Sequence, residues 1–435
     1  ALFHVREKRD RMAHAVPEWE ALRQAASEIK LHTLSHLGRY LEEFERNATA
    51  NGMVVHWASD AREMNRIVLD ILRRHGGRTL IKSKSMLSEE CGLAPFLAGQ
   101  GIDAVESDLG ERIMQLMHRP PSDIVLPAIH VRREEVGELF ERELGTARGD
   151  SDPTYLTHEA RKHLRGKFLT ADVAMTGVNF AVASEGAFAV CTNEGNADLG
   201  TSFPDLHIAI MGLEKVVPDY RSLAVFTRLL ARSATGQPVT AYTSLYRRPE
   251  PGKQIHVVIV DNGRTESLRN EAHRNMLKCL RCGACMNTCP VYRRSGGYSY
   301  SYFIPGPLGI NLGMLRTPER YAGNVSGCSL CYSCSNVCPA RIDLGEQIYA
   351  WRQEMDADGV ADTRKKLAVE GMDVVMRHKT LFYTGLKLIP WVPRFVYNNR
   401  FNPWCAGREM PHFARRSFNE LWKEGKIATE KKEKR

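Results

Sequence analysis

The sequence CLRCGACMNTCP runs from Cys279 to Pro290, and CSLCYSCSNVCP runs from Cys328 to Pro339. Both stretches follow the pattern C-x2-C-x2-C-x3-C-P, and together they contain eight of the 11 cysteines. Three thiolates at this spacing on a tight loop can each reach one iron of a [4Fe–4S] cubane, and in two-cluster ferredoxins the fourth cysteine binds the other cluster. The repeated pattern therefore predicts two [4Fe–4S] clusters that exchange their fourth ligands.

The pattern assigns four cysteines to each cluster. We expect cluster 1 to be held by Cys279, Cys282, Cys285 and Cys338, and cluster 2 by Cys328, Cys331, Cys334 and Cys289. Structural zinc usually takes two C-x2-C pairs separated by a longer loop, and a redox C-x-x-C site needs a single pair. Because a third thiol follows each pair at once, iron–sulfur ligation is favoured over both alternatives.

We also predict roles for residues outside the eight ligands. Arg281, Arg293 and Arg294 place positive charge near the clusters, which favours the reduced, more negative cluster and so raises its potential. The alternative is that these arginines only solvate the surface. Cys191 lies in the apolar run AFAVC and is expected to be an ordinary core thiol.

Length and composition are those of an ordinary soluble chain. The 435 residues can form two or three domains, and 43% of them are hydrophobic. No secretory leader and no uncharged apolar run of about 18 residues is visible, and clustered thiols indicate metal binding rather than a disulfide scaffold. We expect a cytoplasmic protein without a transmembrane segment, with peripheral attachment to the inner face of the membrane as an alternative. We expect the net charge of +9 to come from basic side chains on a solvated surface, and we predict no nucleic acid partner.

Sequence patterns divide the chain into four regions. Residues 1–75 are expected to be helical, and residues 265–355 are expected to form a mainly α-helical two-cluster ferredoxin domain. Residues 76–262 alternate short apolar runs such as RTLIKSK, DIVLPAIHV and IHVVIVDNG with amphipathic stretches, which indicates an α/β domain. Within it, NFAVASEGAFAV at 179–190 is typical of a β-hairpin. Residues 356–435 form a C-terminal basic and aromatic segment with a polar tail.

The C-terminal segment could serve as a contact surface. Residues 374–408 contain seven aromatic residues, no Asp or Glu, and six basic residues, which are Arg377, Lys379, Lys387, Arg394, Arg400 and Arg408. We expect this stretch to pack on the protein's own surface or on a partner, ahead of a membrane surface or nucleic acid.

Polar residues near the ends of the expected strands form a candidate ligand site. Substrate-binding candidates are Lys82, Ser83, Lys84, Ser85, Asn179, Asn193 and His207, and catalytic candidates are Glu185 and Glu194. Ligands of α/β sheets bind at the carboxyl ends of the strands, and ammonium groups beside hydroxyls suit a carboxylate or a phosphate. Either glutamate could act as a general base or a nucleophile. One alternative is that the two Glu-Gly pairs are ordinary turn sequences. The other is that His207 is an ordinary histidine at the end of a strand.

Four stretches resemble the LUD (lactate-utilisation) domain, namely IKSKSMLSEECGL, GIDAVESDLGERIMQL, TGVNFAVASEGAFAVCTNEGN and HIAIMGLEKVVP. With the two cysteine motifs after them and MPHFARRSFNELW near the C-terminus, the chain resembles the iron–sulfur subunit of the bacterial L-lactate utilisation complex from about residue 5 to residue 422. The resemblance implies a fold similar to the ribose-phosphate isomerase and CoA-transferase superfold. It also implies two partners, a second LUD-domain subunit and a cysteine-rich subunit similar to heterodisulfide reductase.

Oxidation of L-lactate to pyruvate removes a hydride equivalent, which flavin or nicotinamide normally accepts. The chain has no G-x-G-x-x-G or Walker motif, so no NAD or nucleotide is expected. We expect a non-catalytic or partly catalytic subunit of an oxidoreductase complex, which relays electrons through its clusters toward the quinone pool or another carrier. The alternatives are a standalone LUD-domain enzyme or ligand-binding protein with structural clusters, acting on another small carboxylate, and a nucleic-acid-binding iron–sulfur protein.

Overall fold

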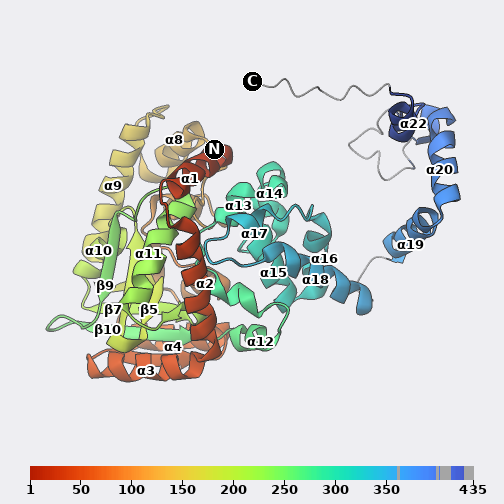
Figure 1. The fold of residues 1–435 in the computed structure, drawn as a ribbon. Helices are drawn as coiled ribbons and strands as arrows, with labels where there is room; N and C mark the ends of the chain where they lie inside the picture. The colour runs from red at the N-terminus through yellow and green to blue at the C-terminus, as the bar shows by residue number, and fades with distance from the viewer. Residues whose placement is uncertain (360–362, 398–400, 402–412, 426–435) are drawn as a thin grey trace. The chain divides into compact units, whose positions relative to one another are not determined.

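The structure is a computed structural model that describes residues 1–359, 363–397, 401 and 413–425. The chain divides into two compact units, residues 1–357 and residues 358–435. The first unit contains both the α/β domain and the cysteine region (Figure 1).

A six-stranded parallel sheet forms the centre of the α/β domain. Its strand order is β1 (Val54–Ala58), β10 (Gln254–Val260), β7 (Leu206–Gly212), β4 (Val173–Gly177), β2 (Thr79–Lys82) and β3 (Asp103–Glu106). Every neighbouring pair is parallel. The carboxyl ends of all six strands therefore lie at one edge of the sheet.

Helices cover both faces of this sheet, because parallel strands need long crossover connections. On one face α4 (Ala61–Arg74) and α6 (Leu93–Ala98) pack against Ile208, Ile210, Val258 and Val260. On the other face α3 (Leu37–Ala50) packs against Ala209, Met211, Val257 and Ile259. Successive side chains of β7 and β10 thus alternate between two apolar cores.

A second sheet has the order β8 (Val216–Val217), β5 (Phe180–Val182), β6 (Ala187–Thr192) and β9 (Tyr242–Tyr246). β5 and β6 form the predicted antiparallel hairpin, and η1 (Ala183–Glu185) with Gly186 makes its turn. Gly186 has a φ of 55°, and a Cβ atom there would lie 2.2 Å from the backbone nitrogen of Ala48. The turn needs glycine both for its left-handed backbone and for this close approach.

Further elements complete the α/β domain. They are α5 (Met86–Glu90), α7 (Leu109–Leu116), α8 (Arg133–Leu144), α9 (Pro153–Thr170), α10 (Asn196–Ser202), η2 (Leu213–Lys215), α11 (Tyr220–Thr235) and α12 (Arg264–Arg269).

Two sequence expectations for this part of the chain were wrong. The region expected to be only helical, 1–75, contributes the edge strand β1, whose Val-Val-His-Trp sequence suits a strand and pairs with β10. The run DIVLPAIHV is a series of turns instead of a strand. Its first residue, Asp123, accepts hydrogen bonds from the amides of Val125 and Leu126 at 2.7 and 2.9 Å, which bends the backbone.

The cysteine region is helical, and it has no strand among its described residues from 264 to 359. It contains η3 (Arg274–Lys278), α13 (Ala284–Thr288), α14 (Pro290–Ser295), η4 (Gly297–Tyr300), α15 (Gly306–Arg316), α16 (Pro318–Gly327), α17 (Ser333–Val337) and α18 (Leu344–Ala357). The N-terminal helices α1 (Leu2–His14) and α2 (Trp19–Ser35) contact α11 of the α/β domain, and they also contact α13 and η3 respectively. They therefore join the two parts of the unit (Figure 1).

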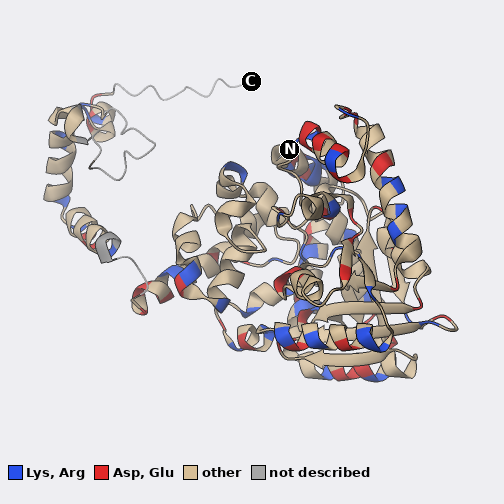
Figure 2. Ribbon diagram, turned by 180° about the vertical axis from the view of Figure 1, so that it is seen from behind, with Lys and Arg blue, Asp and Glu red and all other residues tan. Residues whose placement is uncertain are grey.

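The second unit contains α19 (Thr363–Arg377), α20 (Lys379–Leu388), η5 (Ile389–Trp391), α21 (Arg394–Tyr397) and α22 (Phe418–Lys423). Parts of the basic stretch, including Arg400 and Arg408, lie outside the described residues. No helix in the described part of the chain is long and apolar enough to cross a membrane. Basic and acidic residues are interspersed along the helices of the first unit (Figure 2).

Candidate functional site

The two cysteine motifs follow the same backbone path. Arg281 and Leu330, two residues after the first cysteine of each motif, have φ values of 61° and 50°. Gly283 and Tyr332, two residues further on, have φ values of 74° and 58°. These left-handed residues turn the backbone N–H groups inward, and such concave arrangements of N–H groups are typical of anion and iron–sulfur sites.

Backbone amides donate to the cysteine sulfurs in both motifs. The Arg281 amide lies 3.3 Å from Cys279 Sγ, and the Leu330 amide lies 3.4 Å from Cys328 Sγ. At the fourth cysteines, the Tyr292 amide donates to Cys289 at 3.5 Å and the Ile342 amide donates to Cys338 at 3.4 Å. Hydrogen bonds to ligand sulfurs are one of the means by which proteins set cluster potentials.

The fourth cysteine of each motif lies near cysteines of the other motif, where α13 packs against α17. One small cavity is lined by Cys279, Cys282, Cys285 and Cys338 together with apolar side chains such as Ile124, Leu308 and Ile342. Burial raises the pKa of the Cys282 thiol to about 12, and the neighbouring Cys279 and Cys338 thiols raise it further. Burial likewise raises the pKa of Cys334 to about 12, with Cys328 and Cys289 as its neighbouring thiols.

Cys285 belongs to the first group of thiols and also lies near the second. Its pKa is raised well above the usual value, first by burial and then by four thiols that include Cys334 of the second motif. In the part of the chain that the structure describes, no three His, Cys, Asp or Glu side chains converge on one metal-ion position.

The two groups differ in their access to solvent. Cys282 and Cys338 of the first group are buried, whereas Cys331 of the second group is exposed. The second motif therefore brings a predicted ligand to the protein surface.

Basic side chains hold the second motif through its carbonyl groups, and sequence reasoning missed them. Arg23 donates to the Cys338 carbonyl at 3.0 and 2.8 Å and to the Asn336 carbonyl at 2.8 Å. Arg9 donates to the Val337 carbonyl at 3.0 Å. From the C-terminal side, Arg352 donates to the Cys328 carbonyl at 2.5 Å. A charged donor to a backbone carbonyl is stronger than a neutral one.

The three arginines noted in the sequence lie in different surroundings. Arg281 is largely buried and faces Glu214, with 3.9 Å between their nearest charged atoms. Arg293 stacks over the Phe3 ring at 4.0 Å and donates to the Asn287 carbonyl at 2.7 Å. Arg294 is exposed. Only Arg281 contributes to the cavity described next.

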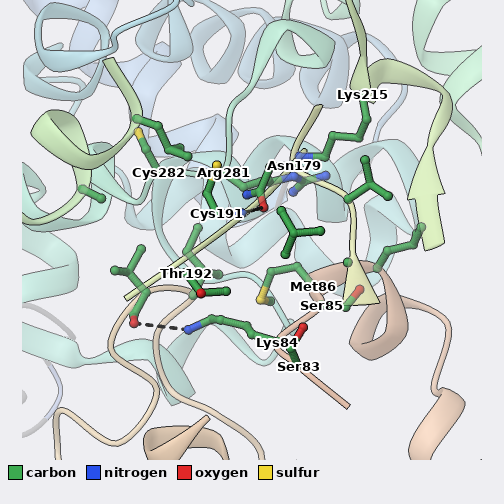
Figure 3. A pocket seen from close by; sticks show the side chains of 18 of the residues that line it. Ser83, Lys84, Ser85, Met86, Asn179, Cys191, Thr192, Lys215, Arg281 and Cys282 are labelled. Carbon is green, nitrogen blue, oxygen red and sulfur yellow. Dashed lines mark hydrogen bonds between the residues drawn. The ribbon is translucent and has the colours of Figure 1, made fainter. Parts of the chain in front are cut away.

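A cavity of about 250 Å³ lies at the carboxyl edge of the parallel sheet. It is lined by Ser83–Ser85 after β2, by Gly177 at the end of β4 and by Gly212 at the end of β7. Arg281 and Cys282 of the first cysteine motif close its far wall. Figure 3 shows Arg281 beside Cys282, Lys215 extending toward Asn179 from the other side, and Ser83 and Lys84 across the cavity. The cavity thus lies between the α/β domain and predicted cluster 1.

Six of the candidate ligand-site residues line this cavity. They are Ser83, Lys84, Ser85, Asn179, Asn193 and Glu194. Lys84 pairs with Glu111 at 2.6 Å, and Asn193 donates to Gln237 at 3.0 Å. Cys191, expected to be a core thiol, also lines the cavity, and burial raises its pKa to about 11.

Glu194 carries a perturbed carboxyl group. It accepts a hydrogen bond from the Leu109 amide at 3.0 Å. Burial of the carboxyl group raises its pKa to about 7, and the nearby Asp108 carboxylate adds to the increase. The residue as a whole is exposed, so water moderates this shift. A carboxyl group with a pKa near neutrality is suited to general acid–base chemistry.

Three of the candidates lie elsewhere, contrary to expectation. Lys82 is fully buried and pairs with Glu106 at 2.6 Å, because its position on β2 is in register with that residue on β3. Glu185 lies at the hairpin turn and pairs with Arg247 at 3.3 Å. His207 is buried within β7, where it shares a hydrogen bond of 2.8 Å with the Thr176 hydroxyl. All three have structural partners outside the cavity.

A buried charge network borders the cavity, and no local sequence pattern indicated it. Arg264 donates to Glu214 at 2.5 Å and to Glu90 at 3.0 and 3.1 Å. Glu90 also pairs with Arg316 of the cysteine region. Burial raises the pKa of Glu214, but the positive charges of Arg264, Lys215 and Arg281 outweigh it and lower the pKa to about 2. Both carboxylates of the network are therefore ionised and already paired.

Comparison with known proteins agrees with this two-part architecture. Residues 41–266 match the LUD domain, and residues 275–342 match the 4Fe-4S dicluster domain. Lactate utilization protein B of Geobacillus thermodenitrificans is 41% identical over 381 residues, which cover 86% of this chain and 80% of that protein. The chain belongs to the lactate utilization protein B family. It is an iron–sulfur protein with an electron-transfer role in lactate utilisation.

Further relatives extend over nearly the whole chain. The uncharacterized electron transport protein YkgF of Escherichia coli K12 is 37% identical over 98% of this chain and 92% of that protein. Lactate utilization protein B of Bacillus cytotoxicus is 37% identical over 96% of this chain and 91% of its own length. A DUF162 family protein of known structure from Deinococcus radiodurans aligns with 52% of this chain at 13% identity and a TM-score of 0.30, too low to carry an argument.

Proposed function

We propose that this chain is the electron-transfer subunit of a multisubunit complex that oxidises L-lactate to pyruvate, and that it carries two [4Fe–4S] clusters. Cys279, Cys282, Cys285 and Cys338 would hold cluster 1, and Cys328, Cys331, Cys334 and Cys289 would hold cluster 2. The observation that carries this proposal is the cavity that Cys338 shares with the three thiols of the other motif. When bound, such clusters accept and release single electrons.

The arrangement of the thiols supports a relay through the protein. Cluster 1 would lie against the wall of the α/β cavity, because Cys282 lines that cavity. Cluster 2 would lie near the surface, because Cys331 is exposed. Cys285 has thiol neighbours from both groups, which supports a short distance for electron transfer between the clusters. Electrons would then leave through the second motif.

The proposed partners are a second LUD-domain subunit and a cysteine-rich subunit similar to heterodisulfide reductase. A partner that contacts the exposed second motif would receive the electrons and pass them to the quinone pool or another carrier. The proposed location is the cytoplasm, with peripheral contact at the inner face of the membrane.

The test is anaerobic purification of the full chain followed by metal analysis and EPR spectroscopy. Two cubanes require about eight irons and eight acid-labile sulfides per chain, and dithionite should produce two interacting reduced centres. Zinc, or only about four irons per chain, would contradict the proposal. Co-purification from the native host tests the partner subunits.

The second candidate function is a standalone LUD-domain enzyme, or a protein that binds another small carboxylate, with structural clusters. Glu194 favours it, because a carboxyl group with a raised pKa lines a cavity at the carboxyl edge of the sheet. The proposed similarity to the ribose-phosphate isomerase and CoA-transferase superfold points the same way. Clusters that dithionite fails to reduce would favour this candidate.

A further inference from the structure

The cavity beside cluster 1 contains a buried guanidinium nitrogen that has no hydrogen-bond partner. Arg264 is shared between Glu90 and Glu214, and Lys84 is paired with Glu111. Arg281 approaches Glu214 only through Nη2, whereas its Nη1 atom is buried and has no hydrogen-bond partner. Leaving a buried charged donor unpaired is costly. An anion in the cavity would remove that cost.

Lys215 adds a second cation to the same end of the cavity. It follows β7 in η2 and lines the cavity, and among the described residues its ammonium group has no hydrogen bond or ion pair. Its pKa is lowered chiefly by burial, and the positive charge of Arg281 adds to the effect while Glu214 opposes it. Figure 3 shows both side chains directed into the same region. Two cations held together in a largely buried site favour an anionic ligand between them.

Neutral polar groups beside this pair indicate what the rest of the ligand carries. The Oδ1 atom of Asn179 accepts a hydrogen bond from the Cys191 amide at 2.9 Å, so its NH₂ group remains available to the cavity. Thr192 and Ser85 line the same space. These groups suit a hydroxyl or keto oxygen. The volume of about 250 Å³ suits a small acid rather than a dinucleotide.

We propose that this chain itself binds a small 2-hydroxy or 2-oxo carboxylic acid, with the carboxylate between Arg281 and Lys215 and the second oxygen at Asn179. The bound acid would lie against the Cys282 wall of the cavity, next to cluster 1. The identity of the acid as L-lactate or pyruvate rests on the proposed function. The existence of the anion site rests on the cavity, on the unpartnered Nη1 atom of Arg281 and on the Lys215 ammonium group.

Another account of the same cations is that they only balance the negative charge of cluster 1, because Lys215 and Lys30 both lie close enough to Cys279 to feel its charge. In that case Lys215 would influence the cluster potential, but the protein would bind no acid. Ligand binding therefore separates the two accounts.

The experiment is equilibrium dialysis of the anaerobically purified full chain with labelled L-lactate and pyruvate, with lactamide as a neutral analogue. We expect saturable binding of one acid per chain, no binding of lactamide, and a change in the EPR spectrum of reduced cluster 1 when the site is filled. Lys215→Met should weaken binding at least about tenfold, because a charged hydrogen bond is lost. The matched control, Lys162→Met, removes an exposed lysine outside the cavity and should leave binding unchanged.

Two results would overturn the inference. One is the absence of acid binding by a wild-type chain that contains its full iron, which would leave the electron-transfer proposal intact. The other is undiminished binding by both Lys215→Met and Arg281→Gln after iron analysis has shown that each variant retains its clusters. Iron content and the EPR spectrum of the unliganded protein test the clusters separately from the acid site.

Discussion

Arg281 and Leu330 occupy equivalent positions in the two cysteine motifs, and both adopt a left-handed backbone, with φ values of 61° and 50°. Each directs its amide to the sulfur of the cysteine two residues before it, at 3.3 and 3.4 Å. A long cation and an apolar side chain thus share a conformation that both disfavour. The path of the loop imposes this left-handed backbone, whichever side chain occupies the position.

Exchange of the fourth ligands can be tested by alanine substitution. We expect Cys338→Ala to abolish the same EPR signal as Cys282→Ala, because both thiols line one cavity. Cys331→Ala should abolish the other signal. Cys191→Ala, which removes a thiol outside both motifs, is the control and should retain both signals. If Cys338→Ala instead reproduced the spectrum of Cys331→Ala, each motif would hold its own cluster.

Loss of the Arg23 side chain should loosen the second motif. Arg23→Met leaves the carbonyls of Cys338 and Asn336 without their charged donor, and we expect it to lower the free energy of unfolding by about 2–3 kcal/mol. Urea unfolding and the rate of iron loss to a chelator measure the effect. Arg39→Met, at an exposed position, should change neither. Equal iron loss from both variants would show that the Arg23 contacts do not hold the loop.

The hairpin turn should tolerate only glycine at position 186. Gly186→Ala would place a Cβ atom 2.2 Å from the Ala48 nitrogen, and we expect a loss of more than about 2 kcal/mol in thermal or urea unfolding. Gly145→Ala is the matched control. Gly145 also has a positive φ, of 68°, but its Cβ atom would meet nothing within 4 Å, so only the backbone cost of about 1 kcal/mol should appear. Equal losses of stability in the two variants would show that the close approach of Gly186 to Ala48 adds no steric cost.

His207 should make the fold sensitive to acid. Burial lowers its pKa to about 3, and the positive charge of Lys253 contributes. Below pH 6.5 the unfolded chain binds a proton that folded His207 does not, so its contribution to stability falls as the pH falls. We expect a loss of about 2 kcal/mol between pH 7 and pH 5. His207→Gln should reduce that loss in urea titrations, whereas exposed His158→Gln should not. An unchanged pH dependence in His207→Gln would contradict the assignment.

The sequence could predict those parts of the site that depend on local spacing. The cysteine pattern indicates ligands because three thiols on one loop need no distant partner. Ser83 and Lys84 could be placed at the ligand edge because they follow β2 directly. Lys82 was placed incorrectly because it still belongs to β2, in register with Glu106 on β3, and its side chain pairs with that carboxylate instead of lining the cavity.

Residues that act across long sequence separations could not be predicted from one sequence. Arg9 and Val337 are 328 positions apart, and Arg264 is 50 positions from Glu214. Nothing in the local composition distinguishes these arginines from surface arginines. Lys215 was overlooked for the same reason, since its role depends on Arg281 reaching the cavity from another domain.

The contact between Arg23 and Cys338 also dictates an order of events during synthesis. A ribosome releases Arg23 long before Cys338, because 315 positions separate them. The guanidinium groups of the first helices therefore remain hydrated until the last cysteine loop has been translated. Iron delivery to a stable site therefore follows the synthesis of that loop.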